Sequence, residues 1–264
     1  MVPLKPNSIS EATFKQVLTR YPSTVPEKLQ ELDTHRYDTI PATVTQRKAD
    51  GDAYLEKGEV ERLVEWKLKH GTFRPKLLNL VQSNTASLIK STTLAAFKTL
   101  NPANPLPSLK ILTELKGIGP ATASLLLAVY APDAVPFFSD ELFRWVQWDE
   151  SGKPGGWQRK IGYTNKEYGH LVEGAGKLRE RLVVQAVEIE KVAWVLGKEG
   201  VDVDGNEDTE KPAAVAAKIE RLEKDWKKTK KETEGVAKGV KRKPEDSKPA
   251  DEGTRRRSRR KPGT

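Results

Sequence analysis

Apolar residues recur at helical spacing from the start of the chain to about residue 198. Val60, Leu63, Val64 and Leu68 follow the i, i+3, i+4 rule that places them on one face of a helix. Residues 120–130 are strongly apolar, so we expect them at the centre of the core. No stretch long enough for a strand alternates between apolar and polar residues. The pattern therefore predicts an all-α body.

Capping residues, glycines and prolines set the expected helix boundaries. Ser8 and Glu11 have the spacing of a capping box, Gly71 suits a helix end, and Pro75 suits a helix start. Three prolines interrupt residues 22–56, where we expect short helices and loops. The other expected helices cover residues 60–70, 75–81, 85–100, 108–115, 120–130, 140–148, 165–198 and 211–231.

Composition divides the chain into four expected parts. Residues 1–52 form a helical and loop segment that packs on the body, and residues 53–200 form the main helical domain. Residues 201–232 combine an acidic loop with a C-terminal helix. Residues 233–264 consist of Lys, Arg, Glu, Pro and Ser with almost nothing apolar, so they are expected to be a disordered basic tail.

The net charge of +9 belongs to the C-terminal end of the chain. Residues 226–264 hold 15 Lys and Arg against 6 Asp and Glu, whereas the preceding 225 residues hold 31 of each sign. Net charge therefore says nothing about nucleic-acid binding by the folded body. A binding face there must be a local patch.

Composition also excludes several classes of protein. The chain has no cysteine, which excludes disulfides and iron–sulfur clusters held by thiolates. No apolar run approaches the roughly 18 residues that a spanning helix needs. The first ten residues, MVPLKPNSIS, lack the apolar centre of a signal peptide. We expect a soluble intracellular protein without a membrane partner.

Two basic clusters in the tail resemble a bipartite nuclear-import signal. They lie about a dozen residues apart and consist of Lys241, Arg242 and Lys243, then Arg255, Arg256, Arg257, Arg259 and Arg260. This arrangement predicts a nuclear, eukaryotic protein that binds import receptors. Non-specific attachment to polyanions is the competing interpretation, and the two are compatible.

The most informative stretch is residues 115–123, which read LKGIGPATA. Two glycines two residues apart permit a tight turn and leave backbone N–H groups uncovered. A helix N-terminus behind such a turn is a natural phosphate site. The predicted ligand is a nucleic-acid backbone, contacted independently of its base sequence. The predicted DNA-binding residues are Lys116, Gly117, Ile118, Gly119, Ala121 and Thr122, with simple solvation as the competing interpretation of Lys116.

The order of motifs resembles the helix-hairpin-helix DNA glycosylases, the HhH-GPD superfamily. An apolar helix follows the hairpin, and then residues 137–146 read FFSDELFRWV. The resemblance is clear over about residues 107–147. It implies a helical glycosylase-like fold, duplex DNA as partner, and a catalytic Asp at the start of a helix. Bifunctional members carry a nucleophilic Lys where this chain has Ala121, so the resemblance implies no lyase activity.

Two alignments with the family pattern place its catalytic Asp at different residues of this chain. Without gaps, Ser139 falls at the family's Asp position, and Arg144 matches the Arg five residues later. One inserted residue in the preceding loop places Asp140 there instead. Asp140, or Glu141, would then stabilise an oxocarbenium-like sugar and orient water. Alternatively, Ser139 is a helix N-cap and both acids are ordinary first-turn residues.

Aromatic residues offer candidates for a base pocket. Trp145 and Trp148 follow the expected Asp helix and are candidates to stack on a flipped base, with core packing favoured for Trp145. Residues 65–74 read EWKLKHGTFR and combine aromatic with basic side chains. They could line a DNA groove or a substrate pocket. We favour the simpler interpretation, a capped surface helix with one Trp in the core. The histidines His35, His70 and His170 lack metal-ligand spacing, so no metal is expected.

These observations predict a nuclear DNA-binding protein of the glycosylase type, without a cofactor. Its possible activity is monofunctional base excision with Asp140 and water. The first alternative is a non-catalytic module that kept the scaffold for binding DNA or protein. A second alternative makes the hairpin a packing or protein-interaction element.

Overall fold

The computed structural model describes residues 3–71 and 74–204, which belong to one of two units into which the chain divides, Met1–Val215. The expected helix over 211–231 and the basic tail lie outside the described residues. Within them every regular element is helical, as predicted, and no strand occurs. No helix of this part combines the length and apolar character needed to cross a membrane.

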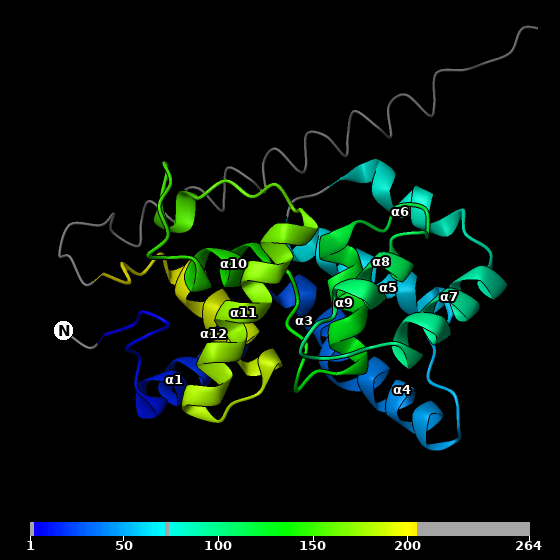
Figure 1. The fold of residues 1–264 in the computed structure, drawn as a ribbon, viewed down its shortest axis with the longest axis horizontal. Coiled ribbons are helices and arrows are strands. Elements are labelled where there is room, and N and C mark those ends of the chain that lie inside the picture. The colour runs from blue at the N-terminus through cyan, green and yellow to red at the C-terminus, as the bar shows by residue number, and fades with distance from the viewer. Residues whose placement is uncertain (1–2, 72–73, 205–264) are drawn as a thin grey trace, which may run out of the picture. The chain divides into compact units, whose positions relative to one another are not determined.

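Twelve α-helices and two short helices of other types make up the described part (Figure 1). The α-helices are α1 Glu11–Leu18, α2 Tyr21–Thr24, α3 Glu27–Thr34, α4 Ile40–Ala49, α5 Lys57–His70, α6 Pro75–Gln82, α7 Ala86–Lys98, α8 Leu106–Leu112, α9 Pro120–Tyr130, α10 Asp140–Val146, α11 Asn165–Leu182 and α12 Ala186–Glu199. A π-helix, η1 His35–Thr39, joins α3 to α4, and a 3₁₀ helix, η2 Gly156–Gln158, follows α10.

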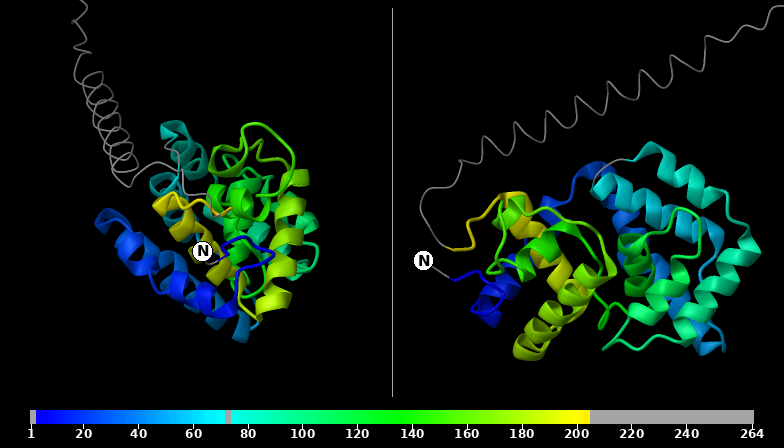
Figure 2. Two further views of the ribbon diagram at one scale, coloured as in Figure 1. Left: turned by 90° about the vertical axis from the view of Figure 1, so that its left-hand side faces the viewer. Right: turned by 45° about the horizontal axis from the view of Figure 1, so that its top comes forward.

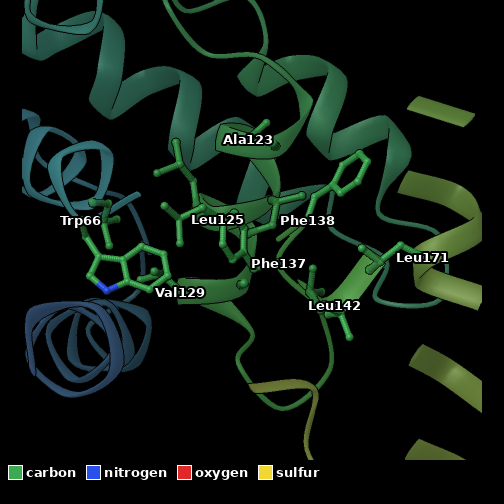
Figure 3. Close-up of a cluster of buried hydrophobic side chains, with 14 of the residues drawn as sticks. Trp66, Ala123, Leu125, Val129, Phe137, Phe138, Leu142 and Leu171 are labelled. Carbon is green, nitrogen blue, oxygen red and sulfur yellow. The ribbon is translucent and has the colours of Figure 1, made fainter. Parts of the chain in front are cut away.

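Helix α9 is the centre of the core, as its composition predicts. All residues from Ala121 to Val129 are buried, and α9 packs against α4, α5, α8 and α11. The segment after it adds Phe137 and Phe138, which lie among Leu125 of α9, Leu142 of α10 and Leu171 of α11 (Figure 3). Burial of so much apolar surface holds the start of α10 in a fixed place relative to α9.

The N-terminal segment is more helical than expected. Prolines 22 and 41 lie in the first turns of α2 and α4, where the missing N–H costs little, and Pro26 directly precedes α3. They therefore start helices rather than interrupt them. The cap of α1 also differs from the expected box, because Ser10, not Ser8, accepts the Thr13 N–H.

Residues from this segment anchor it to the C-terminal helices. Arg36 in η1 forms a buried ion pair of 3.1 Å with Glu190 of α12, and the Tyr37 hydroxyl donates to the same carboxylate at 2.7 Å. The Arg181 guanidinium on α11 donates to the carbonyls of Pro6 and Ile9, so the first residues lie beside α11 and α12 (Figure 2).

The expected long helix over 165–198 is two helices. The chain leaves α11 at Val183, which has a left-handed backbone with φ 53°, and α12 begins three residues later. The Ala186 and Val187 N–H groups donate to the carbonyls of Asp133 and Pro132. Tertiary hydrogen bonds therefore fix a break that the apolar periodicity does not show.

Candidate functional site

A tight turn joins α8 to α9, and Gly117 gives it its shape. Gly117 has φ +78°, which favours glycine. A Cβ at this position would lie 3.0 Å from Leu80 Cβ and from Val81 Cγ2, so the turn packs directly on α6. Glycine is thus required here for two independent reasons, the backbone conformation and the close approach of α6.

Asn84, which sequence reasoning missed, fixes this turn. Its buried side-chain amide donates to the carbonyls of Val81 and Lys116 at 2.9 Å, and its Oδ1 accepts the Lys116 N–H at 3.0 Å. One side chain therefore joins both backbone groups of Lys116 to the end of α6. The only sequence feature that could have indicated this role of Asn84 is an amide side chain between two expected apolar helices.

The turn leaves a set of backbone N–H groups unused. Gly119 is the N-cap of α9 and provides no side-chain cap. Within the described part of the chain, the N–H groups of Gly117, Gly119 and Ala121 donate no hydrogen bond. Gly119 is exposed, and a Cβ there would meet nothing within 4 Å. This bare helix N-terminus has the geometry that binds anions in other proteins.

Two of the predicted DNA-binding residues use their backbone N–H groups within the turn. The Ile118 N–H donates to the Leu115 carbonyl and the Thr122 N–H to the Gly119 carbonyl. The Ile118, Ala121 and Thr122 side chains are buried. Ile118 and Thr122 therefore support the turn from within. Lys116 is exposed and its side chain is free to reach an anion.

Ser139 is the N-cap of α10. Its Oγ accepts the Leu142 N–H at 3.1 Å, and its side chain is buried. Two further bonds hold the preceding segment. The Phe138 N–H donates to Ser124 Oγ on α9 at 2.9 Å, and the Tyr168 hydroxyl donates to the Pro136 carbonyl at 3.0 Å. These bonds hold the segment that leads into α10 against α9 and α11.

Asp140 is half-buried, and each of its two carboxylate oxygens has a polar neighbour. The Tyr163 hydroxyl donates to Oδ1 at 2.6 Å, and the Arg144 guanidinium lies 3.4 Å from Oδ2. Glu141 has a different environment. It packs on Gly197 of α12, lies 3.9 Å from Lys198, and its burial raises the pKa of its carboxyl. Of the two candidate acids, Asp140 is the one in a polar, partly open environment.

The cluster EWKLKHGTFR contributes to the same region. Trp66 is the buried core residue that the favoured interpretation predicts. Lys67 is half-buried, and burial lowers the pKa of its amine. The charge of Arg74 lowers this pKa further, whereas the charge of Asp140 raises it. The Arg74 guanidinium lies 5.8 Å from the Tyr163 ring centroid. Tyr163 and Arg144 thus contact Asp140 directly, and the charges of Lys67 on α5 and of Arg74 before α6 lie in the same region.

The tryptophan candidates are engaged in packing. Trp145 is fully buried, and its Nε1 donates to the Leu4 carbonyl at 2.9 Å, so its ring is closed to a base. Trp148 is partly exposed, donates to Asp204 at 2.9 Å and contacts Trp157 edge to face. Cavities of about 680 and 670 Å³ lie against α11, and neither is lined by the turn or by Asp140.

Among the described residues, no group of His, Asp or Glu side chains is arranged to hold a metal ion. Comparison with protein-family models, with curated proteins and with solved structures finds no significant match to this chain.

Proposed function

We propose that this chain is a DNA-binding protein of the helix-hairpin-helix glycosylase type, which holds the backbone of duplex DNA at the α8–α9 turn. The observation that carries the proposal is the uncapped N-terminus of α9, where the N–H groups of Gly117, Gly119 and Ala121 have no partner among the described residues. A phosphate placed there accepts these groups and is favoured by the helix dipole. Contacts of this kind position a protein on DNA without reading its sequence.

Gly119→Asp is the sharpest test of the turn. The Gly119 backbone, with φ −95° and ψ 179°, suits Asp, and the space around it is open. Asp is a favoured N-cap, so the variant should fold at least as stably as the parent while its carboxylate takes the place of the phosphate. Duplex affinity is measured by fluorescence anisotropy in a chain that ends near residue 225, so that the tail does not obscure the result.

Two controls separate local from general effects. Gly119→Ala keeps the N–H groups free and should retain most of the affinity. Gly176→Asp adds the same charge on α11, also into open space, and should bind like the parent. Unchanged duplex affinity of Gly119→Asp would contradict the proposal and favour the hairpin as a packing or protein-interaction element.

Base excision by Asp140 is the second candidate function. Asp140 opens α10, is held by Tyr163 and Arg144, and is linked to the hairpin helix through Ser124. In this function a base is flipped from the duplex, the Asp140 carboxylate stabilises the oxocarbenium-like sugar, and water is the nucleophile. Ala121 provides no amine for lyase chemistry. The assay is base release from duplexes that contain uracil, alkylated or oxidised bases.

The Asp140→Asn variant decides the catalytic role. It should lose base release and keep duplex binding, with Glu141→Gln as the matched control that retains activity. Base release that survives Asp140→Asn would show that Asp140 is not the catalytic carboxylate. Duplex binding without base release from any of these substrates would favour the non-catalytic module, in which the contacts of Asp140 to Tyr163 and Arg144 are structural.

We also propose a nuclear location through the two basic clusters of the tail, which lie outside the described residues. Import receptors bind such clusters as cationic peptides. Replacing Lys241, Arg242 and Lys243 by Ala in a fluorescently tagged full chain should shift it from nucleus to cytoplasm. An unchanged nuclear signal would contradict the proposal.

A further inference from the structure

Two cations beside Asp140 lack a carboxylate of their own. In the described part of the chain, neither Lys67 nor Arg74 forms an ion pair with an Asp or Glu. Asp140 does not fill this role, because its oxygens already accept the Tyr163 hydroxyl at 2.6 Å and face Arg144 at 3.4 Å. Arg144 is thus the cation that pairs with Asp140.

Protein carboxylates compensate the charges of the half-buried Lys67 and the exposed Arg74 only in part. Lys67 is half-buried, and both its burial and the neighbouring Arg74 lower the pKa of its amine, while Asp140 offsets only part of this effect. Like charges in a partly desolvated environment repel each other more strongly than in water. An anion held between the two side chains would remove this repulsion.

We propose that Lys67 and Arg74 form a phosphate-binding site that takes a phosphodiester of a nucleic-acid backbone beside Asp140. The Lys67 amine supplies a compact charge, and the Arg74 guanidinium supplies a forked donor that matches two phosphate oxygens. The ring of Tyr163, 5.8 Å from the Arg74 guanidinium, keeps that side chain over the cluster. No residue of the α8–α9 turn takes part.

Helix α6 relates this site to the turn. Arg74 immediately precedes α6, and Val81 near its other end packs on Gly117. A helix of eight residues is roughly 12 Å long, which corresponds to a few nucleotides at about 3.4 Å each along one strand. The two sites can therefore contact one DNA backbone at separate phosphates. The choice of a polymer rests on the proposed function, whereas phosphate binding itself does not.

The test measures duplex affinity against salt concentration in the full chain, so that the tail contributes equally to every variant. Lys67→Gln and Arg74→Gln should each reduce the slope of log Kobs against log salt by about 0.9, which means about fivefold weaker binding at 0.15 M salt. Lys69→Gln and Arg62→Gln are the charge-matched controls. Both residues lie on α5 and pair with Glu65, and both variants should keep the parent slope.

A second arm follows the melting temperature in inorganic phosphate against chloride at equal ionic strength. Phosphate should stabilise the Gly119→Asp variant, whose turn no longer takes an anion, and adding Lys67→Gln should abolish this stabilisation. Unchanged slopes in Lys67→Gln and Arg74→Gln, with loss of binding in Gly119→Asp, would overturn the second site and leave the proposed function intact. Phosphate stabilisation with unchanged duplex slopes would overturn the backbone contact and identify a free-phosphate site. A parent chain that binds no duplex would refute the proposed function, and the phosphate arm would still decide the anion site.

Discussion

The Tyr163 hydroxyl donates a 2.6 Å hydrogen bond to Asp140 while the Tyr163 backbone is left-handed, with φ 54°. A bulky residue with positive φ is an outlier that costs roughly 1–3 kcal/mol. The carboxylate of Glu167 offsets this cost, because it accepts the N–H groups on both sides of Tyr163, from Gly162 and Thr164, each at 2.9 Å. The fold therefore stabilises a strained residue whose one polar atom contacts the candidate acid.

Tyr163→Phe tests this contact. The ring can keep its packing on Phe138, 5.6 Å away, so the change removes only the donor. We expect a loss of about 1 kcal/mol in unfolding free energy, below the usual 1.5–3 kcal/mol for a bond to a charged group because solvent partly screens Asp140. Urea denaturation measures it. The control is Tyr130→Phe, whose hydroxyl has no hydrogen bond in the described part. Equal losses in the two variants would contradict a specific role for the Tyr163 bond.

The sequence predicts the helices better than it predicts the site. The central helix α9, the end of α5 at Gly71 and the start of α6 at Pro75 follow from local composition. The break at Val183 does not, because tertiary hydrogen bonds override an apolar pattern that continues through it. The contacts of Asn84 to Lys116 and of Tyr163 to Asp140 span 32 and 23 residues, and no local pattern indicates such pairs. The sequence thus predicts a turn at residues 115–120 and a helix that starts near Asp140, but not the residues that hold them.

Asn84→Ala should destabilise the α8–α9 turn. It leaves the carbonyl and N–H of Lys116 without their buried partner, and each unsatisfied buried group costs about 1–3 kcal/mol. We expect a loss of about 2–3 kcal/mol in urea unfolding and faster hydrogen exchange at the Lys116 amide. Asn79→Ala, an exposed position on α6, is the control and should change little. Parent-like exchange at Lys116 in Asn84→Ala would show that the turn keeps its shape without this anchor.

Val183→Asn should stabilise the protein. Val183 is 90% exposed and has φ 53° and ψ 49°, a conformation that Val tolerates poorly and Asn adopts readily. We expect a gain of about 1 kcal/mol in unfolding free energy. The adjacent Val184, which packs partly against the core, supplies the control, since Val184→Asn should lose stability. A loss of stability in Val183→Asn would mean that the Val183 side chain makes a stabilising contact that its exposure does not suggest.

His70 should make the fold sensitive to acid. Its ring stacks between Trp66 at 4.4 Å and Trp194 at 3.6 Å, and its Nε2 has no partner in the described part. Burial, together with the charges of Lys198, Arg36 and Lys67, places the pKa of His70 well below 6.5. The folded state therefore keeps His70 neutral where the unfolded state binds a proton. The contribution of His70 is complete above pH 6.5 and is lost as the pH falls below it, by about 1.4 kcal/mol per pH unit until the folded pKa is reached.

His70→Phe removes this sensitivity and retains an aromatic ring in the stack. The difference in unfolding free energy between the parent and His70→Phe, measured by urea denaturation from pH 8 to pH 5, should be constant above pH 6.5. Below that pH it should move in favour of the variant. His170→Gln changes an exposed imidazole on α11 and should show the parent's loss of stability. A constant difference between the parent and His70→Phe over the whole range would mean that the folded protein takes up the proton at His70 as readily as the unfolded chain. The tryptophan stack would then have to open in acid at no cost to stability.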